Sequence, residues 1–104
     1  MQREAAIFRA LGDPSRLAIF ESLARQASPV KGLTAQFRIS QPAVSQHLAA
    51  LKAAGLVTVR RDGRLAHYAV NAAGLKPLKD WLAHYQAFWP ERIRRLDALL
   101  KGME

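Results

Sequence analysis

The first half of the chain repeats hydrophobic residues at the spacing of an α-helix. Apolar positions three and four residues apart predict four short helices, and each has a boundary signal in the sequence. Asp13 before Pro14 is typical of a helix start, as is Ser40 before Pro42, while Gly12 and Gly55 are typical of helix ends. The predicted helices cover residues 3–11, 14 to the Ser28-Pro29 stop, 30–37 and 41–54.

After residue 56 the pattern changes from helical to alternating, as in a strand. Val57 and Val59 alternate with polar residues, and Asp62-Gly63 is a signal for a type I′ hairpin turn. Pairing across that turn would place Val57 opposite Tyr68 and Val59 opposite Ala66. We therefore predict a two-stranded hairpin with one apolar face.

The last third carries a near-heptad apolar stripe that predicts a terminal helix over residues 75–101. Pro90 lies within it and should kink or split that helix. The stripe consists of Leu75, Leu78, Leu82, Tyr85, Trp89, Ile93, Leu96 and Leu100.

The order of these elements predicts a winged helix-turn-helix with one extra helix at each end. The expected fold is mostly α, with about five helices plus a two-stranded wing. A chain of 104 residues is expected to form a single domain, 1–104.

The helix after Ser40 has the character of a DNA-recognition helix. Val44, Leu48 and Leu51 form its buried stripe, whereas its opposite face is short and uncharged. Neutral donors and acceptors near a helix N-terminus can bond to base edges in a major groove. That outward face consists of Gln41, Pro42, Ser45 and Gln46.

Charge and composition support a nucleic-acid partner. Sixteen Lys and Arg against eight Asp and Glu give a net charge of +8, which favours a polyanion such as double-stranded DNA. Arg60, Arg61 and Arg64 gather at the hairpin tip; they fit insertion in or beside a minor groove, although they could merely keep the hairpin soluble.

There is no cysteine, no apolar run long enough to span a membrane and no catalytic constellation. We expect a cytoplasmic protein without enzymatic activity or cofactor.

Three stretches of the sequence resemble the ArsR/SmtB family of bacterial winged-helix repressors. They are residues 11–19 (LGDPSRLAI), residues 39–48 (ISQPAVSQHL) with Leu51, and residues 55–57 (GLV) leading through 61–64 (RDGR) to His67-Tyr68. The resemblance implies a homodimeric repressor whose two recognition helices enter successive major grooves of an inverted repeat. It places Gln41, Pro42, Ser45 and Gln46 at the bases, Arg61 and Arg64 at the wing, and Arg16 and His47 in phosphate contact or structural duty.

The resemblance also implies that the first and last helices, about 3–11 and 75–101, form the dimer interface. The residues expected there are Ile7, Phe8, Leu82, Tyr85, Trp89, Ile93 and Leu96. Trp81, Tyr85, Phe88 and Trp89 make an aromatic cluster that suits either a dimer seam or a pocket for an apolar effector.

The chain departs from the family's metal-sensing members. Residues 30–37 hold no cysteine pair, and no histidine follows His84, so the Asp80–His84 pair is at best half of a metal site. We expect no metal site, and an effector, if there is one, would be an unknown small molecule or protein. Two other functions stay open: a low-specificity architectural DNA-binding protein, and a protein-interaction module that uses the aromatic C-terminal helix.

Overall fold

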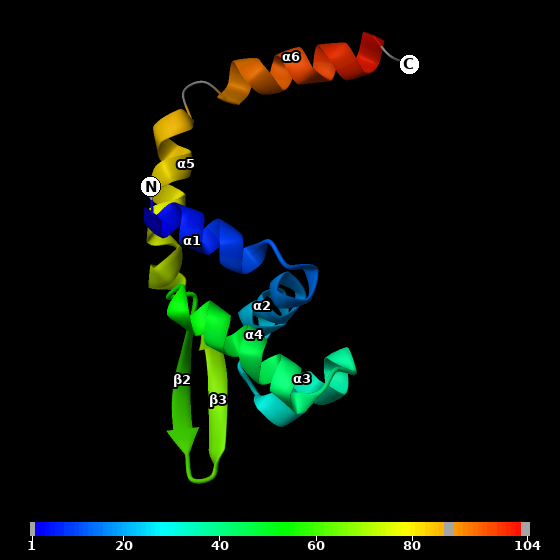
Figure 1. Ribbon diagram of the computed structural model, residues 1–104. Coiled ribbons are helices and arrows are strands. Elements are labelled where there is room, and N and C mark those ends of the chain that lie inside the picture. Colours follow the sequence, from blue (N-terminus) through cyan, green and yellow to red (C-terminus); the bar gives the residue numbers. More distant parts are fainter. Residues whose placement is uncertain (1, 87–88, 103–104) are drawn as a thin grey trace.

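The computed structural model describes residues 2–86 and 89–102. For Tyr85 and Trp89 it describes the backbone but not the side chain. Within these residues it contains six α-helices, a short 3₁₀-helix (η1) and three strands (Figure 1). The elements are α1 (Gln2–Leu11), α2 (Pro14–Arg25), β1 (Ser28–Pro29), α3 (Val30–Phe37), α4 (Gln41–Ala53), β2 (Val57–Asp62), β3 (Leu65–Val70), η1 (Ala72–Leu75), α5 (Lys76–Tyr85) and α6 (Trp89–Gly102). The predicted mostly helical, winged-helix architecture is confirmed.

The helix boundaries follow the local signals in the sequence. Asp13 caps α2, because its Oδ2 accepts a hydrogen bond from the backbone N–H of Arg16 at 2.8 Å. Ser40 caps α4 in the same way, with its Oγ accepting from the N–H of Ala43 at 3.2 Å. Gly55 follows α4 with a φ of +79°, the left-handed conformation expected of a glycine after a helix. These predictions are confirmed.

The sheet has three strands, in the order β1-β3-β2, where the sequence predicted two. The additional strand is the Ser28–Pro29 segment, which pairs antiparallel with Tyr68 and His67 of β3. The residue before a proline is held extended, and proline lacks an N–H, so such a segment fits only the edge of a sheet. Ser28–Pro29, predicted only as the end of a helix, therefore forms one edge of the wing sheet, while α2 itself ends at Arg25.

The predicted pairing of the hairpin was wrong by two residues. Val57 lies opposite Val70 and Val59 lies opposite Tyr68, because the two-residue loop is Gly63-Arg64 and not Asp62-Gly63. Gly63 has a φ of +61° whereas Arg64 has no positive φ, the pattern of a turn with glycine at its first central position. A shift by two residues keeps every side chain on the predicted face, so the apolar face of β2 is unchanged.

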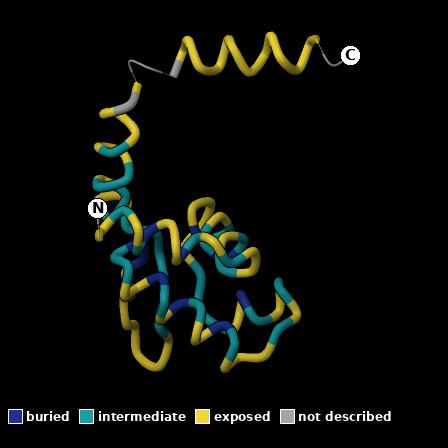
Figure 2. Tube along the Cα trace, turned by 45° about the horizontal axis from the view of Figure 1, so that its top comes forward, coloured by how far each residue is buried: buried dark blue, intermediate teal, exposed yellow. Residues whose placement is uncertain are grey.

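The core lies where α1, α2, α3 and α4 meet the base of the hairpin (Figure 2). Val44, Leu48 and Leu51 of α4 are at most 1% exposed, which confirms the buried stripe of this helix. In α2 the buried residues are Ile19 and Leu23, whereas Leu17 is 38% exposed although it falls on the same apolar periodicity. The recognition helix thus packs on the core through its apolar face.

The single terminal helix predicted over residues 75–101 is divided into η1, α5 and α6. α5 ends at Tyr85 and α6 begins at Trp89, so the split expected near Pro90 is confirmed, and Pro90 lies in the first turn of α6. α6 projects away from the rest of the chain (Figure 1), and residues 90–102 are all exposed. No helix in the described part of the chain is long and apolar enough to cross a membrane.

Candidate nucleic-acid interface

The polar face of α4 is exposed at the N-terminal end of the helix. Gln41, Pro42, Ser45 and Gln46 are all exposed. The Ser40 cap fixes the first turn, and the buried stripe on the other face fixes the rotation of the helix. The helix therefore presents hydrogen-bonding groups without charge in a rigid frame, as a base-reading helix does.

α3 and α4 form the helix-turn-helix through a three-residue connection. α3 ends at Arg38, whose φ of +55° is left-handed and whose N–H donates to the carbonyl of Thr34 at 3.0 Å. No sequence signal marks Arg38 for this conformation, which usually favours glycine or asparagine. The sharp reversal at Arg38 places α3 against α4.

The hairpin β2–β3 extends beyond the helices as a wing (Figure 1). Arg60, Arg61 and Arg64 are all exposed, with Arg64 in the turn itself. Arg60 and Arg61 are neighbours in one strand, so their side chains leave opposite faces of the hairpin. The wing is thus basic on both faces and at its tip, rather than on one side.

Arg16 and His47 both lie close to the carboxylate of Asp13, which caps α2. Arg16 donates through Nη1 to the carbonyl of Ala10 at 3.2 Å and so ties the end of α1 to the start of α2. His47 Nδ1 lies 3.9 Å from Asp13 Oδ2, which brings α4 to the same point. The Arg16 bond fits the structural one of the two roles expected for these residues, whereas His47 Nδ1 makes no hydrogen bond among the described residues and its role stays a prediction. The local sequence pattern predicted the capping role of Asp13 but not its proximity to His47.

A candidate dimer surface runs along α1, α5 and α6. Phe8 is 49% exposed, and its ring meets that of Trp81 edge to face, with centroids 5.5 Å apart. By contrast, Ile7 is 2% exposed and belongs to the core of the chain, so it has almost no surface left for a partner. The other exposed large apolar side chains of α5 and α6 are Leu82, Ile93, Leu96, Leu99 and Leu100. Of the remaining expected residues, the side chains of Tyr85 and Trp89, and all of Phe88, lie outside the described part.

The residues considered for a metal do not gather into a site. Across residues 2–86 and 89–102 there is no group of three or more His, Cys, Asp or Glu side chains that could hold a metal ion. Asp80, the possible partner of His84, accepts a hydrogen bond from Lys76 Nζ at 2.7 Å.

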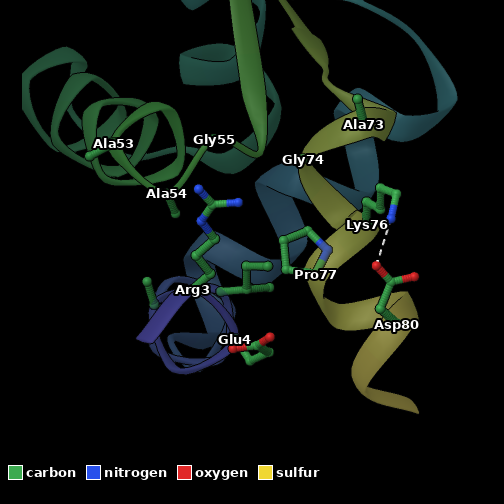
Figure 3. A pocket seen from close by; sticks show the side chains of 12 residues that line it. Arg3, Glu4, Ala53, Ala54, Gly55, Ala73, Gly74, Lys76, Pro77 and Asp80 are labelled. Atoms are coloured by element: carbon green, nitrogen blue, oxygen red, sulfur yellow. Dashed lines mark hydrogen bonds and ion pairs between the residues drawn. The ribbon is translucent and has the colours of Figure 1, made fainter. Parts of the chain in front are cut away.

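A cavity of about 620 Å³ lies between α1, the end of α4 and the start of α5 (Figure 3). Its charged side chains are two cations and two anions: Arg3, Glu4, Lys76 and Asp80. A backbone hydrogen bond lowers the pKa of Glu4, which favours its ionised form. The lining therefore has no excess of either sign.

A capped helix with an uncharged exposed face, the helix-turn-helix that it forms with α3, and the basic hairpin after it define a winged helix-turn-helix DNA-binding protein. A sequence profile described as "Bacterial regulatory protein, arsR family" matches residues 13–59. The chain belongs to the ArsR family of bacterial transcription regulators, and it is accordingly not an enzyme.

Relatives along most of the chain agree with this assignment. The chain is 40% identical over 86 residues to the HTH-type transcriptional regulator Rv2034 of Mycobacterium tuberculosis. This match covers 83% of this chain and 78% of that protein. It is 44% identical over 69 residues to the "Transcriptional repressor SmtB homolog" of Synechocystis sp., covering 66% of this chain and 52% of that relative. The match thus spans about half the length of the Synechocystis protein. The solved structure of an ArsR-like transcriptional regulator from Rhodococcus sp. RHA1 superposes with a TM-score of 0.76 at 30% identity, over 94% of this chain and 92% of that one.

Proposed function

We propose that the protein is a homodimeric transcriptional repressor that binds an inverted-repeat operator and does not respond to metal ions. The observation that carries the proposal is the exposed, uncharged face of α4 behind its Ser40 cap. A binder without sequence preference would gain more from Lys and Arg at these positions, because they would neutralise phosphates. Gln41, Ser45 and Gln46 instead offer groups that distinguish one base pair from another.

The arginines of the wing and the recognition helix contribute to DNA binding in different ways. Arg60, Arg61 and Arg64 supply affinity that depends on salt and not on sequence, since they contact phosphates or a minor groove. Pro42 offers only apolar contact and suits the methyl group of a thymine. Because its target is chromosomal DNA, a bacterial regulator of this kind acts in the cytoplasm.

Support for a homodimer comes from the exposed apolar side chains of α1, α5 and α6. Ile93, Leu96 and Leu100 follow one another at three- and four-residue steps on α6, and each is more than half exposed in the single chain. An apolar stripe of this kind marks a protein interface, and an isologous pair of copies buries it on both subunits. Two recognition helices related by a two-fold axis would then read half-sites about one helical turn apart.

The test is a selection of bound duplexes from a random pool at about 150 mM salt, with the mass of the protein measured by light scattering. We expect a dimer and an enriched inverted repeat. Binding without enrichment would instead support the architectural alternative, and no binding would support the interaction module. Addition of zinc or arsenite should leave the affinity for the selected operator unchanged; release of the DNA would contradict the metal-independent part of the proposal.

Matched variants of α6 test the dimer separately. Leu96→Gln removes an apolar group from the stripe and should shift the protein toward monomer, together with a loss of operator affinity. Arg92→Gln changes another exposed residue of the same helix and should leave the mass unchanged. If both variants stay dimeric with wild-type affinity, α6 does not hold the dimer.

A further inference from the structure

The connection after the recognition helix meets the start of the terminal helices at two glycines (Figure 3). A Cβ atom built on Gly74 would lie 1.8 Å from the carbonyl oxygen of Gly55 and 2.7 Å from its carbonyl carbon. Real Cβ atoms essentially never come within 3.0 Å of another heavy atom of this kind. Only glycine therefore fits at position 74 with the backbone in this arrangement.

Hydrogen bonds hold the same contact from both sides. Asn71 Nδ2 donates to the carbonyl of Gly55 at 3.0 Å, and the backbone N–H of Asn71 donates to the carbonyl of Leu56 at 2.9 Å. The N–H of Gly74 in turn donates to the carbonyl of Asn71 at 2.9 Å. The Asn71–Gly74 segment is thus fixed to the residues that immediately follow α4.

This contact lies on the covalent and spatial path between the two functional surfaces. Gly55 follows the helix that carries Gln41 and Ser45, and Gly74 lies two residues before α5, which leads into the candidate dimer surface. The cavity beside the contact separates the end of α4 from parts of α1 and α5, so α5 has room to change its tilt. The close approach of the two glycines therefore decides how near α5 comes to the end of α4.

We propose that Gly74, together with Asn71, is a positioning residue that sets the separation of the two recognition helices in the dimer and thereby the spacing of the operator half-sites. The inference rests on the proposed function, since it requires a dimer bound to two half-sites. Neither residue needs to touch DNA for this effect.

The size of the effect follows from the geometry. A methyl group at position 74 must move from 1.8 Å to at least 3.0 Å from the Gly55 oxygen, a displacement of about 1.2 Å. Over the roughly 15 Å length of a ten-residue helix such as α5, this displacement is a tilt of about 5°. Each recognition helix would lie about 17 Å from the two-fold axis, so the pair would move apart or together by about 3 Å, close to one base-pair step of 3.4 Å.

The experiment compares Gly74→Ala with the wild-type protein on inverted repeats whose half-sites are separated by the selected spacing and by one or two base pairs more or less. A single half-site duplex is included to measure recognition by one protomer. We expect the best spacing to shift by about one base pair and the affinity at the original spacing to fall on the order of tenfold. Half-site affinity should stay at the wild-type value. Gly102→Ala, where an added Cβ meets nothing within 4 Å, should retain the wild-type profile.

The outcomes separate positioning from simple destabilisation. A folded, dimeric Gly74→Ala protein with the wild-type spacing profile would overturn the inference, and so would an equal loss of affinity at every spacing and on the half-site. If circular dichroism shows that Gly74→Ala is unfolded, Asn71→Ala decides, because it removes one hydrogen bond and adds no atom at the contact. A weaker preference between adjacent spacings supports the inference, and an unchanged preference overturns it. A wild-type protein without any preferred spacing would overturn the proposed function itself.

Discussion

Replacing Gln41 and Arg64 separately should divide the DNA affinity into a sequence-reading part and an electrostatic part. Gln41 is the first residue of α4, exposed and uncharged, so on the proposed function its removal should take away contacts to base edges only. A good base contact contributes about 1–3 kcal/mol of discrimination. Gln41→Ala should therefore weaken binding to the selected operator by about 5- to 150-fold and leave binding to unrelated DNA almost unchanged.

Arg64 is exposed in the turn of the wing, where its charge can reach a phosphate. Each phosphate contact adds about 0.9 to the slope of log affinity against log salt concentration. Over a fourfold increase from about 50 to 200 mM salt, one contact accounts for about 3.5-fold in affinity. The deficit of Arg64→Ala relative to wild type should shrink by that factor over this range, and equally on operator and unrelated DNA.

The assay is fluorescence anisotropy with labelled operator and scrambled duplexes at several salt concentrations. Gln2→Ala and Arg92→Ala are the controls, since they remove the same groups from exposed positions on α1 and α6. The division of roles is refuted if Gln41→Ala lowers both affinities by one factor, or if Arg64→Ala acts on the operator alone without changing the salt slope.

Three further predictions concern the frame that holds this surface. Leu51→Ala empties a site that is 0% exposed and should lower the free energy of unfolding by about 2–5 kcal/mol in urea titrations; a loss near zero would contradict its place in the core. Ser40→Ala removes the cap of α4 and should cost about 1 kcal/mol, while Ser40→Asp, which can also cap, should restore most of it in the same titrations. Gly63→Ala introduces a side chain at a φ of +61° and should cost about 1–2 kcal/mol in thermal unfolding, whereas Gly63→Asn should cost less; equal losses would argue against strain in the turn.

Local signals in the sequence were sufficient for most of the helices and for the recognition surface. Asp13 and Ser40 cap the helices that follow them because a side-chain oxygen three residues before a backbone N–H needs no other part of the chain. The left-handed conformation of Gly55 likewise follows from its position directly after a helix. The exposure of Gln41 and Ser45 follows from the buried stripe of their own helix. Most of the candidate DNA surface could accordingly be predicted without a structure.

Tertiary contacts decided the features for which the local sequence is compatible with two structures. Asp62-Gly63 and Gly63-Arg64 both make a two-residue turn, and the hairpin pairing observed uses the second, while Ser28–Pro29 pairs with the other edge of β3. Ile7 and Phe8 are neighbours on α1, and only packing against the other helices buries the first and leaves the second exposed. These outcomes depend on residues distant in sequence.

The sequence by itself thus determined the first four helices, the starts of α2 and α4 and the exposed uncharged face of α4, because capping and periodicity act over a few residues. Only the tertiary structure decided the strand register, the third strand and the fate of Ile7. It also revealed the contact between Gly55 and Gly74, nineteen positions apart, which no local pattern marks. The physical reason is the distance over which each effect acts. Helix and turn propensities act between neighbours in sequence, whereas strand register and the contact of Gly55 with Gly74 depend on surfaces that pack against one another.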